Sequence, residues 1–216
     1  MIHVYAFADG LRGLPRIDGL DGAPLEEVSV GGVSTVFSRR HSVRETQRED
    51  AIVHGLVVGA LERAADVVVP VRYGQEVRDE RALADAVDGN AEAIRAAFVR
   101  VRGCAEIAVR VWGARREAPQ SVTGADYLRA RRAAESQRRA TVDSLHGRLF
   151  GLARDSRIRY GSLGDEELFV AAYLVPSSRL DEVSRAVEAF GSAHPDLTVV
   201  CTGPWPPFSF VDEVAG

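Results

Sequence analysis

The sequence predicts an α+β protein of two domains, the second of them ferredoxin-like. Its length of 216 residues is enough for one large or two small domains, since domains of about 100 residues are common. Hydrophobic residues make up 46% of the chain and charged residues 27%, as in ordinary globular proteins. After residue 104 the segments follow the order strand, helix, strand, strand, helix, strand, which is that of a ferredoxin-like domain. We therefore expect domains at 1–104 and 105–216.

Each segment of the expected C-terminal domain has its own hydrophobic pattern. In the long helix, Val142, Leu145 and Leu149 recur at the three- and four-residue spacing of one helix face. Thr123 is the residue type expected at its N-cap. The order of segments predicts an antiparallel sheet with both helices on one face. The expected segments are a strand at 105–113, a helix at about 123–154, strands at about 157–162 and 167–175, a helix at 178–191 and a strand at 197–202.

The N-terminal half also mixes strands and helices, in an order that does not by itself identify a fold. Residues 2–8 alternate as a half-buried strand would. Gly31-Gly32 between two strand-like runs predicts a β-hairpin, and Pro70 predicts an edge strand or a bulge. The expected segments are strands at 2–8, 26–30, 33–38 and 67–74, a helix at about 43–65, and a helical pattern from Leu83 to Phe98.

The charge and the hydrophobic runs argue against several kinds of partner. The formal net charge is −4, which disfavours general attraction to nucleic acid or to an anionic membrane. No apolar run approaches the ~20 residues that span a bilayer, and the N-terminal strand pattern is unlike a signal peptide. We expect a cytoplasmic protein.

Motifs that would carry catalysis or hold a cofactor are not found. The five histidines lack a metal-ligand spacing, and Cys104 and Cys201, far apart in apolar runs, are expected to be buried free thiols. The glycine-rich stretch DGLRGLPRIDGLDG lacks the G-K-[ST] of a phosphate-binding loop, so a flexible loop is favoured. GSLG at 161–164 is best explained as a turn. We expect no catalytic residue, metal, cofactor or small-molecule substrate.

The polar face of the long helix is rich in arginine. Its candidate contact residues are Arg131, Arg132, Arg138 and Arg139. Such a face could bind anions or RNA, but Glu135 lies among the arginines and the whole chain is acidic. A solvated surface or a salt-bridged contact is therefore favoured, and no nucleic-acid partner is expected.

The stretch TGPWPPFSF, residues 202–210, is the most unusual in the chain. Proline fixes its own backbone and extends the residue before it, so Trp205, Phe208 and Phe210 are held in fixed positions. Two interpretations stay open, an intramolecular brace across the domain boundary and an exposed docking strip. The brace is favoured, with Trp205 buried and both phenylalanines near the boundary between the domains.

Four segments, VVVPVRYG, GCAEIAVRVWG, TGADYLRARR and TGPWPPFSF, occur in this order with helices between them. Together they resemble the GvpL/GvpF family of gas vesicle proteins, over almost the whole chain. Tyr73 stands where that family usually has phenylalanine, and Phe208 where it usually has tyrosine. The motif residues are Pro70, Arg72, Tyr73, Gly74, Gly203, Pro204, Trp205, Pro206, Pro207, Phe208 and Phe210.

The resemblance implies a non-enzymatic accessory or minor structural protein that is needed to build gas vesicles. It implies a cytoplasmic protein associated with these organelles, whose partners are the hydrophobic shell protein and other accessory proteins. The alternative is a small α+β ligand-binding module or enzyme, because ferredoxin-like domains host many activities. A deep pocket lined by carboxylates or histidines with shifted pKa values would favour that alternative.

Overall fold

The computed structural model describes residues 1–40, 48–113, 123–161 and 166–211, and the chain forms two compact units. The first contains Met1–Cys104 together with the residues from Trp205 onward, and the second is Ala105–Pro204. The predicted α+β class is confirmed, with an antiparallel sheet in each unit. The expected second domain ran to residue 216, whereas residues 205–211 pack with the first unit.

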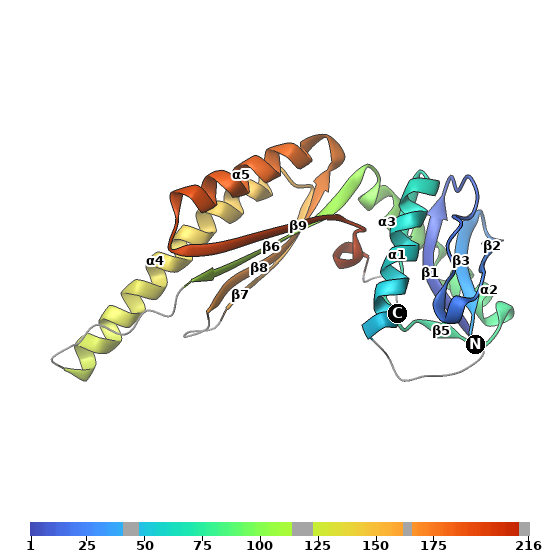
Figure 1. Cartoon of the computed structure of the whole chain (residues 1–216), viewed down its shortest axis with the longest axis horizontal. Helices are drawn as coiled ribbons and strands as arrows, with labels where there is room; N and C mark the ends of the chain where they lie inside the picture. The colour runs from blue at the N-terminus through green and yellow to red at the C-terminus, as the bar shows by residue number, and fades with distance from the viewer. Residues whose placement is uncertain (41–47, 114–122, 162–165, 212–216) are drawn as a thin grey trace. The chain divides into compact units, whose positions relative to one another are not determined.

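The first unit has three layers, with a sheet between helices (Figure 1). Helix α1 packs on one face through Val57, Val58 and Leu61, and α2 and α3 pack on the other. The strand order is β2-β3-β1-β4, and β5 also pairs with β1. The elements are β1 (Ile2–Asp9), η1 (Leu20–Gly22), β2 (Leu25–Val30), β3 (Val33–Arg39), α1 (Arg48–Ala64), β4 (Val67–Pro70), β5 (Glu76–Val77), α2 (Glu80–Gly89), α3 (Ala91–Val101) and η3 (Phe208–Phe210).

Strand β1 is buried on both faces, so the expectation of a half-buried strand is wrong. The reason is that helices cover both sides of the sheet, which the alternation within one strand does not reveal. The register of β1 against β3 shifts between Val4 and Ala6, so Tyr5 is the extra residue of a β-bulge. Tyr5 therefore points towards α1, as Ala6 does.

Other local expectations for the first unit are confirmed or corrected. Gly31 and Gly32 have φ of 57° and 81° in the hairpin between β2 and β3, as the paired glycines predicted. Strand β4, which ends at Pro70, is an edge strand opposite β1. The helical pattern from 83 to 98 is two helices, because the chain breaks at Asn90, the C-cap of α2 and N-cap of α3.

The second unit has the strand order β7-β8-β6-β9, which is the ferredoxin-like arrangement that the segment order predicted. Helices α4 and α5 lie on the same face of the sheet (Figure 1). Their apolar residues meet those of β6 and β8 in one core. The elements are β6 (Cys104–Gly113), α4 (Gly124–Phe150), β7 (Asp155–Tyr160), β8 (Glu167–Pro176), η2 (Ser177–Arg179), α5 (Leu180–Ala193) and β9 (Leu197–Trp205).

Thr123 caps α4 as predicted, because its hydroxyl accepts a hydrogen bond from the Asp126 amide at 3.2 Å. The expectation of two buried thiols is wrong, since Cys104 is half-buried and Cys201 is exposed on β9. Most of the GSLG stretch, residues 162–164, lies outside the described residues. Among the helices that are described, none is both long and apolar enough to cross a membrane.

Candidate functional site

Two of the motif segments meet at one side chain of the first unit, His54 on α1. The carbonyl of Val71, in the VVVPVRYG segment, lies 2.8 Å from His54 Nε2. The ring of Tyr73, from the same segment, has its centroid 5.8 Å from that of His54. Phe208 of the terminal strip also packs against His54, with the ring centroids 6.1 Å apart. Segments more than a hundred residues apart therefore share one buried histidine.

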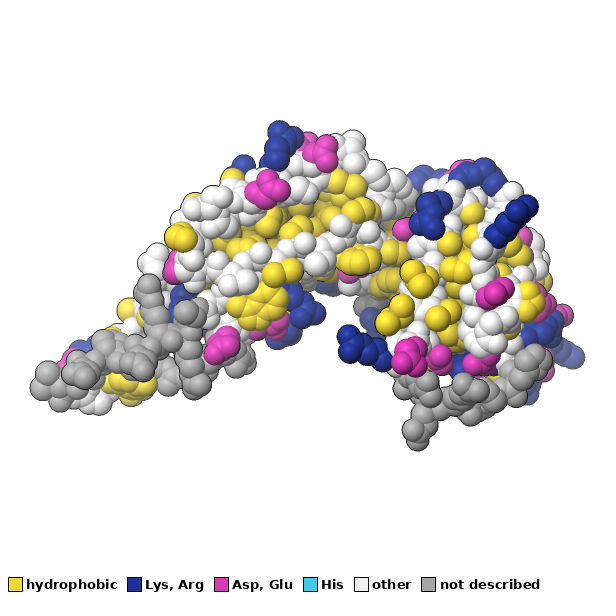
Figure 2. Space-filling view, in the orientation of Figure 1, with side chains coloured by type: hydrophobic (Ala, Val, Ile, Leu, Met, Phe, Trp, Pro, Cys, Tyr) yellow, Lys and Arg dark blue, Asp and Glu magenta, His cyan; other side chains and the backbone are white. Residues whose placement is uncertain are grey.

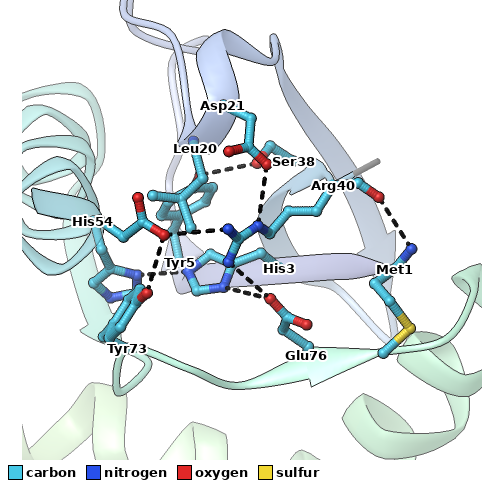
Figure 3. A network of polar contacts seen from close by, with 11 residues as sticks. Met1, His3, Tyr5, Leu20, Asp21, Ser38, Arg40, His54, Tyr73 and Glu76 are labelled. Carbon is cyan, nitrogen blue, oxygen red and sulfur yellow. Dashed lines mark hydrogen bonds and ion pairs between the residues drawn. The ribbon is translucent and has the colours of Figure 1, made fainter. Parts of the chain in front are cut away.

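His54 is hydrogen-bonded to a second buried histidine, His3 on β1 (Figure 3). Because a carbonyl only accepts, His54 Nε2 carries the hydrogen that it donates to Val71. In a neutral ring its Nδ1 is then an acceptor, and His3 Nε2 donates to it at 2.9 Å. His3 Nδ1 is left without a hydrogen-bond partner among the described residues. The nearest carboxylate oxygen, on Glu76, is 3.8 Å away.

A nearly buried guanidinium, Arg40, lies beside the two histidines (Figure 3). Its side chain is 5% exposed and is surrounded by three carboxylates, which are only partly exposed. The nitrogen–oxygen distances are 3.3 Å to Asp21, 3.1 Å to Asp50 and 3.2 Å to Glu76. Arg40 thus joins the end of β3 to the loop before β2, to α1 and to β5. Tyr73 adds a hydrogen bond from its hydroxyl to Asp50, at 3.3 Å.

The end of the glycine-rich loop before β2, residues 19–22, packs on this network. The Leu20 amide donates to the hydroxyl of Tyr5 at 2.7 Å, and that hydroxyl also bonds to Ser38 at 2.8 Å. A Cβ atom at Gly19 would lie 2.4 Å from the Tyr5 oxygen. Glycine is needed there because the loop backbone lies directly on the tyrosine. The loop also brings Asp21 to Arg40.

Burial keeps both histidines neutral. Burial lowers the pKa of His3 from 6.5 to about 3, because the charged form loses hydration. The interaction with His54 and the charge on Arg40 add to this shift. Burial also lowers the pKa of His54, although the hydrogen bond to Val71 opposes the shift. These two rings serve as neutral hydrogen-bonding groups at neutral pH.

We expect stability to fall as the pH drops below about 6.5. Above that pH both histidines are neutral in the folded and unfolded chains, so the free energy of unfolding is unaffected by them. Below it the unfolded chain takes up protons that the folded chain does not. Each histidine then lowers the free energy of unfolding by up to about 1.4 kcal/mol for each pH unit. For His3 this loss continues towards pH 3, the region of its pKa in the folded chain.

Denaturant unfolding across this pH range measures the effect. His3→Gln should reduce the slope of the unfolding free energy against pH by the contribution of one titrating group, because glutamine does not titrate. If that variant does not fold, nitrogen NMR of the histidine rings in the wild-type protein gives the same information. An imidazolium signal for His3 at pH 5.5 in the folded protein would contradict the prediction.

The terminal strip divides into an exposed and a buried part. Gly203, Pro204 and Trp205 are exposed at the end of β9, whereas Pro206 and Pro207 are buried. Phe208 is half-buried against the α1 core. Phe210 is 1% exposed and its carbonyl accepts a hydrogen bond from Arg100 at 3.3 Å. Val211 lies in the core beneath α2 and α3.

Trp205 is 51% exposed, so the expectation that it is buried is wrong. The anchors of the strip are Phe208, Phe210 and the two buried prolines. The backbone of a tryptophan between two prolines is rigid, but this rigidity does not determine whether its side chain is buried or exposed. The position of the whole strip as a brace across the domain boundary stays a prediction.

The remaining predicted site residues shape the turn between β4 and β5. Pro70 is buried opposite Ala6, Arg72 is exposed, and Gly74 has a φ of +93°. A positive φ favours glycine. After this turn the chain rejoins the edge of β1, where β5 pairs with it antiparallel, as β4 does. The motif residues at 70–74 therefore place Tyr73 and Glu76 around His54 and Arg40.

The arginine-rich face of α4 lies in the second unit. Arg139 stacks over the ring of Tyr160 at 3.2 Å from its centroid and lies 3.5 Å from Asp143. Arg138 is half-buried and Arg132 is exposed. The side chain of Arg131 lies outside the described residues. The face thus includes at least one arginine with a structural contact, and its role in binding stays a prediction.

The described residues offer little that would support chemistry. They contain no group of three His, Cys, Asp or Glu side chains placed to hold a metal ion. A half-open cavity of about 90 Å³ lies between β1, β5 and α2, lined mainly by Val4, Phe7, Val71, Leu83 and Val87. Its lining includes Glu76 as the one ionisable residue, and ligand sites are commonly about 300–1,000 Å³. His41 lies outside the described residues.

Sequence reasoning missed His3, His54 and Arg40. Their spacing in the chain carries no signal, because they come from β1, α1 and the end of β3. A weak signal did exist for His3, a polar residue within the apolar strand IHVYAFAD. For Arg40 only the tertiary structure supplies the three carboxylates.

A family model, a curated relative and two solved structures that are similar to this chain are all gas vesicle proteins. The family model described as gas vesicle synthesis protein GvpL/GvpF matches residues 1–212. Gas vesicle protein F2 of Halobacterium salinarum is 29% identical over 98% of this chain and 92% of its own. The crystal structures of GvpF from Anabaena and from Microcystis aeruginosa superpose with TM-scores of 0.84 and 0.78. Both are 16% identical and cover 98% of this chain, and 95% and 98% of their own. These two show that the fold is shared.

Proposed function

Since this chain belongs to the gas vesicle synthesis protein GvpL/GvpF family, we propose that it assists gas vesicle assembly by binding the hydrophobic shell protein. The observation that carries the proposal is the family match over residues 1–212, which includes both the network and the terminal strip. A shell subunit must keep an apolar face, which makes the free subunit prone to aggregate. A protein that covers this face before assembly would need an apolar surface of its own.

The outer face of α1 supports this role. Ile52 and Leu56 are 55% and 58% exposed, and residues four apart lie on the same side of a helix. Figure 2 shows hydrophobic side chains over α1. A largely exposed pair of apolar residues contributes little to the stability of the monomer. We propose that this pair, called the α1 ridge, contacts the shell protein.

Two glycines lie beside the α1 ridge. A Cβ atom at Gly55 or Gly59 would meet nothing within 4 Å, so internal packing does not require glycine at either position. Each costs helix stability, about 1 kcal/mol relative to alanine. Glycine on an outer helix face allows the backbone of another chain to approach closely. This cost is consistent with selection for a partner rather than for the stability of α1.

Binding to purified shell protein of the same gas vesicle cluster tests the proposal. We expect Ile52→Ser with Leu56→Ser to weaken binding by about tenfold or more, the loss of about 1.4 kcal/mol. The unfolding free energy should change little, because exposed positions contribute within about 0.5 kcal/mol. Gly55→Ala should stabilise the protein and still weaken binding. Val99→Ser, at an apolar residue 74% exposed on α3, is the matched control.

Two outcomes would count against this assignment. If wild-type protein does not bind the shell protein at all, the proposed function is wrong. If binding occurs but the Ile52 and Leu56 variants bind as wild type does, the α1 ridge is not the contact. Other accessory proteins of the cluster serve as further partners in the same assay.

A further inference from the structure

Strand β9 is an edge strand with an unusual composition. It hydrogen-bonds to β6 on one side, and no other described strand of the sheet lies beyond it (Figure 1). Its sequence, LTVVCTGPW, contains no charged residue. Thr198 and Cys201 are exposed, and Val200 is 40% exposed. An exposed, uncharged edge readily pairs with a further strand.

The other edge strands are protected against such pairing. Natural edge strands carry charges or proline, or are very short. Strand β7 has Arg157 and Arg159 on either side of its exposed Ile158. Strand β2 has two consecutive glutamates. Strand β4 has four residues and ends in Pro70. Among the edges that the structure describes, β9 lacks these devices from Leu197 to Gly203.

We propose that β9 pairs with β9 of a second copy of this chain, antiparallel about Cys201, so that Val200 lies opposite Thr202 of the other copy. The two sheets then join into one continuous sheet across a twofold axis. The argument for a second copy is the charge pattern. Antiparallel self-pairing of β7 about Ile158 would place Arg157 opposite Arg159, and like charges directly opposite are destabilising. Self-pairing of β9 opposes only uncharged residues, most of them β-branched types that favour strands.

The contact is small, so the dimer is weak and depends on concentration. Each added backbone hydrogen bond contributes little in net terms, and interfaces of small area are typical of transient association. The geometry also gives a chemical marker. Cys201 lies at the centre of the pairing, directly opposite its counterpart, which is within the reach of a disulfide. It is exposed and forms no disulfide within the chain.

Sedimentation velocity of the full chain over a concentration series tests the proposal. We expect a reversible monomer–dimer equilibrium, and an association constant lowered about tenfold or more by Val200→Lys, or about 1.4 kcal/mol. Ile158→Lys on β7 is the matched control, since Ile158 is 42% exposed and Val200 is 40% exposed. In the Cys104→Ser protein, a mild oxidant should give a dimer linked through Cys201.

Several results would overturn the proposal. A wild-type protein that stays monomeric at every concentration excludes self-pairing, and so does a β9 that pairs only with the shell protein. If Val200→Lys and Ile158→Lys weaken the dimer equally, the contact between the two copies is not at β9. If Val200→Lys does not fold, the oxidation of Cys201 is the test. A dimer that is not cross-linked through Cys201 would contradict the proposed register of β9 against its copy.

Discussion

Replacement of Arg40 by methionine is expected to lower the free energy of unfolding by about 3–5 kcal/mol, the cost of removing one partner from a buried ion pair. Methionine fills similar space but leaves Asp21, Asp50 and Glu76 without their shared cation. These three carboxylates lie together around the guanidinium, so they would repel one another in a partly buried site. Denaturant unfolding at pH 7 measures the loss.

The neighbouring residue gives a matched control. Arg39 also contacts two carboxylates, those of Glu26 and Glu80, but its side chain is 47% exposed against 5% for Arg40. Exposed ion pairs are screened by solvent and contribute little, so Arg39→Met should change stability far less than Arg40→Met. Similar losses for the two variants would show that burial does not govern the contribution of Arg40.

The second large effect concerns the terminal strip. Phe210→Ala should cost about 3–5 kcal/mol, because a fully buried aromatic side chain leaves a cavity. Trp205→Ala should cost far less, although tryptophan is larger, since Trp205 is 51% exposed and Phe210 is 1% exposed. Differential scanning calorimetry of both variants separates the two contributions.

This comparison decides which part of the motif anchors the strip. A large loss at Phe210 with a small loss at Trp205 would place the anchor in the residues that pack on the first unit. A tryptophan variant that melts as wild type does but binds cluster proteins weakly would make Trp205 a contact residue. A large loss at Trp205 with none at Phe210 would reverse the assignment.

Local patterns predicted much of the fold. The segment order after residue 104 was enough for the ferredoxin-like arrangement, because few topologies accommodate it. Gly31-Gly32, Pro70 and Thr123 each have a conformational preference that does not depend on the rest of the chain. The strand expected at 67–74 is shorter than predicted, because it ends at Pro70 and the chain turns through Gly74, whose φ is +93°.

The expectations that failed depend on contacts between distant segments. Alternation in residues 2–8 reports one covered face, but helices from two other parts of the chain cover both. A rigid strip such as 202–210 has two sides, and only the packing of Phe208 on His54 shows which is covered. The candidate site itself was not predicted, because it is assembled from β1, the end of β3, α1 and β5.

The sequence by itself determined the α+β class, the family and the local structure of the turns and caps, because these depend on residue type, short-range spacing and motif order. The tertiary structure alone decided that His3 and His54 are neutral, that Arg40 is surrounded by carboxylates and that Trp205 is exposed. Burial and electrostatic environment are sums over neighbours in space. A linear pattern does not contain those neighbours until the chain has folded.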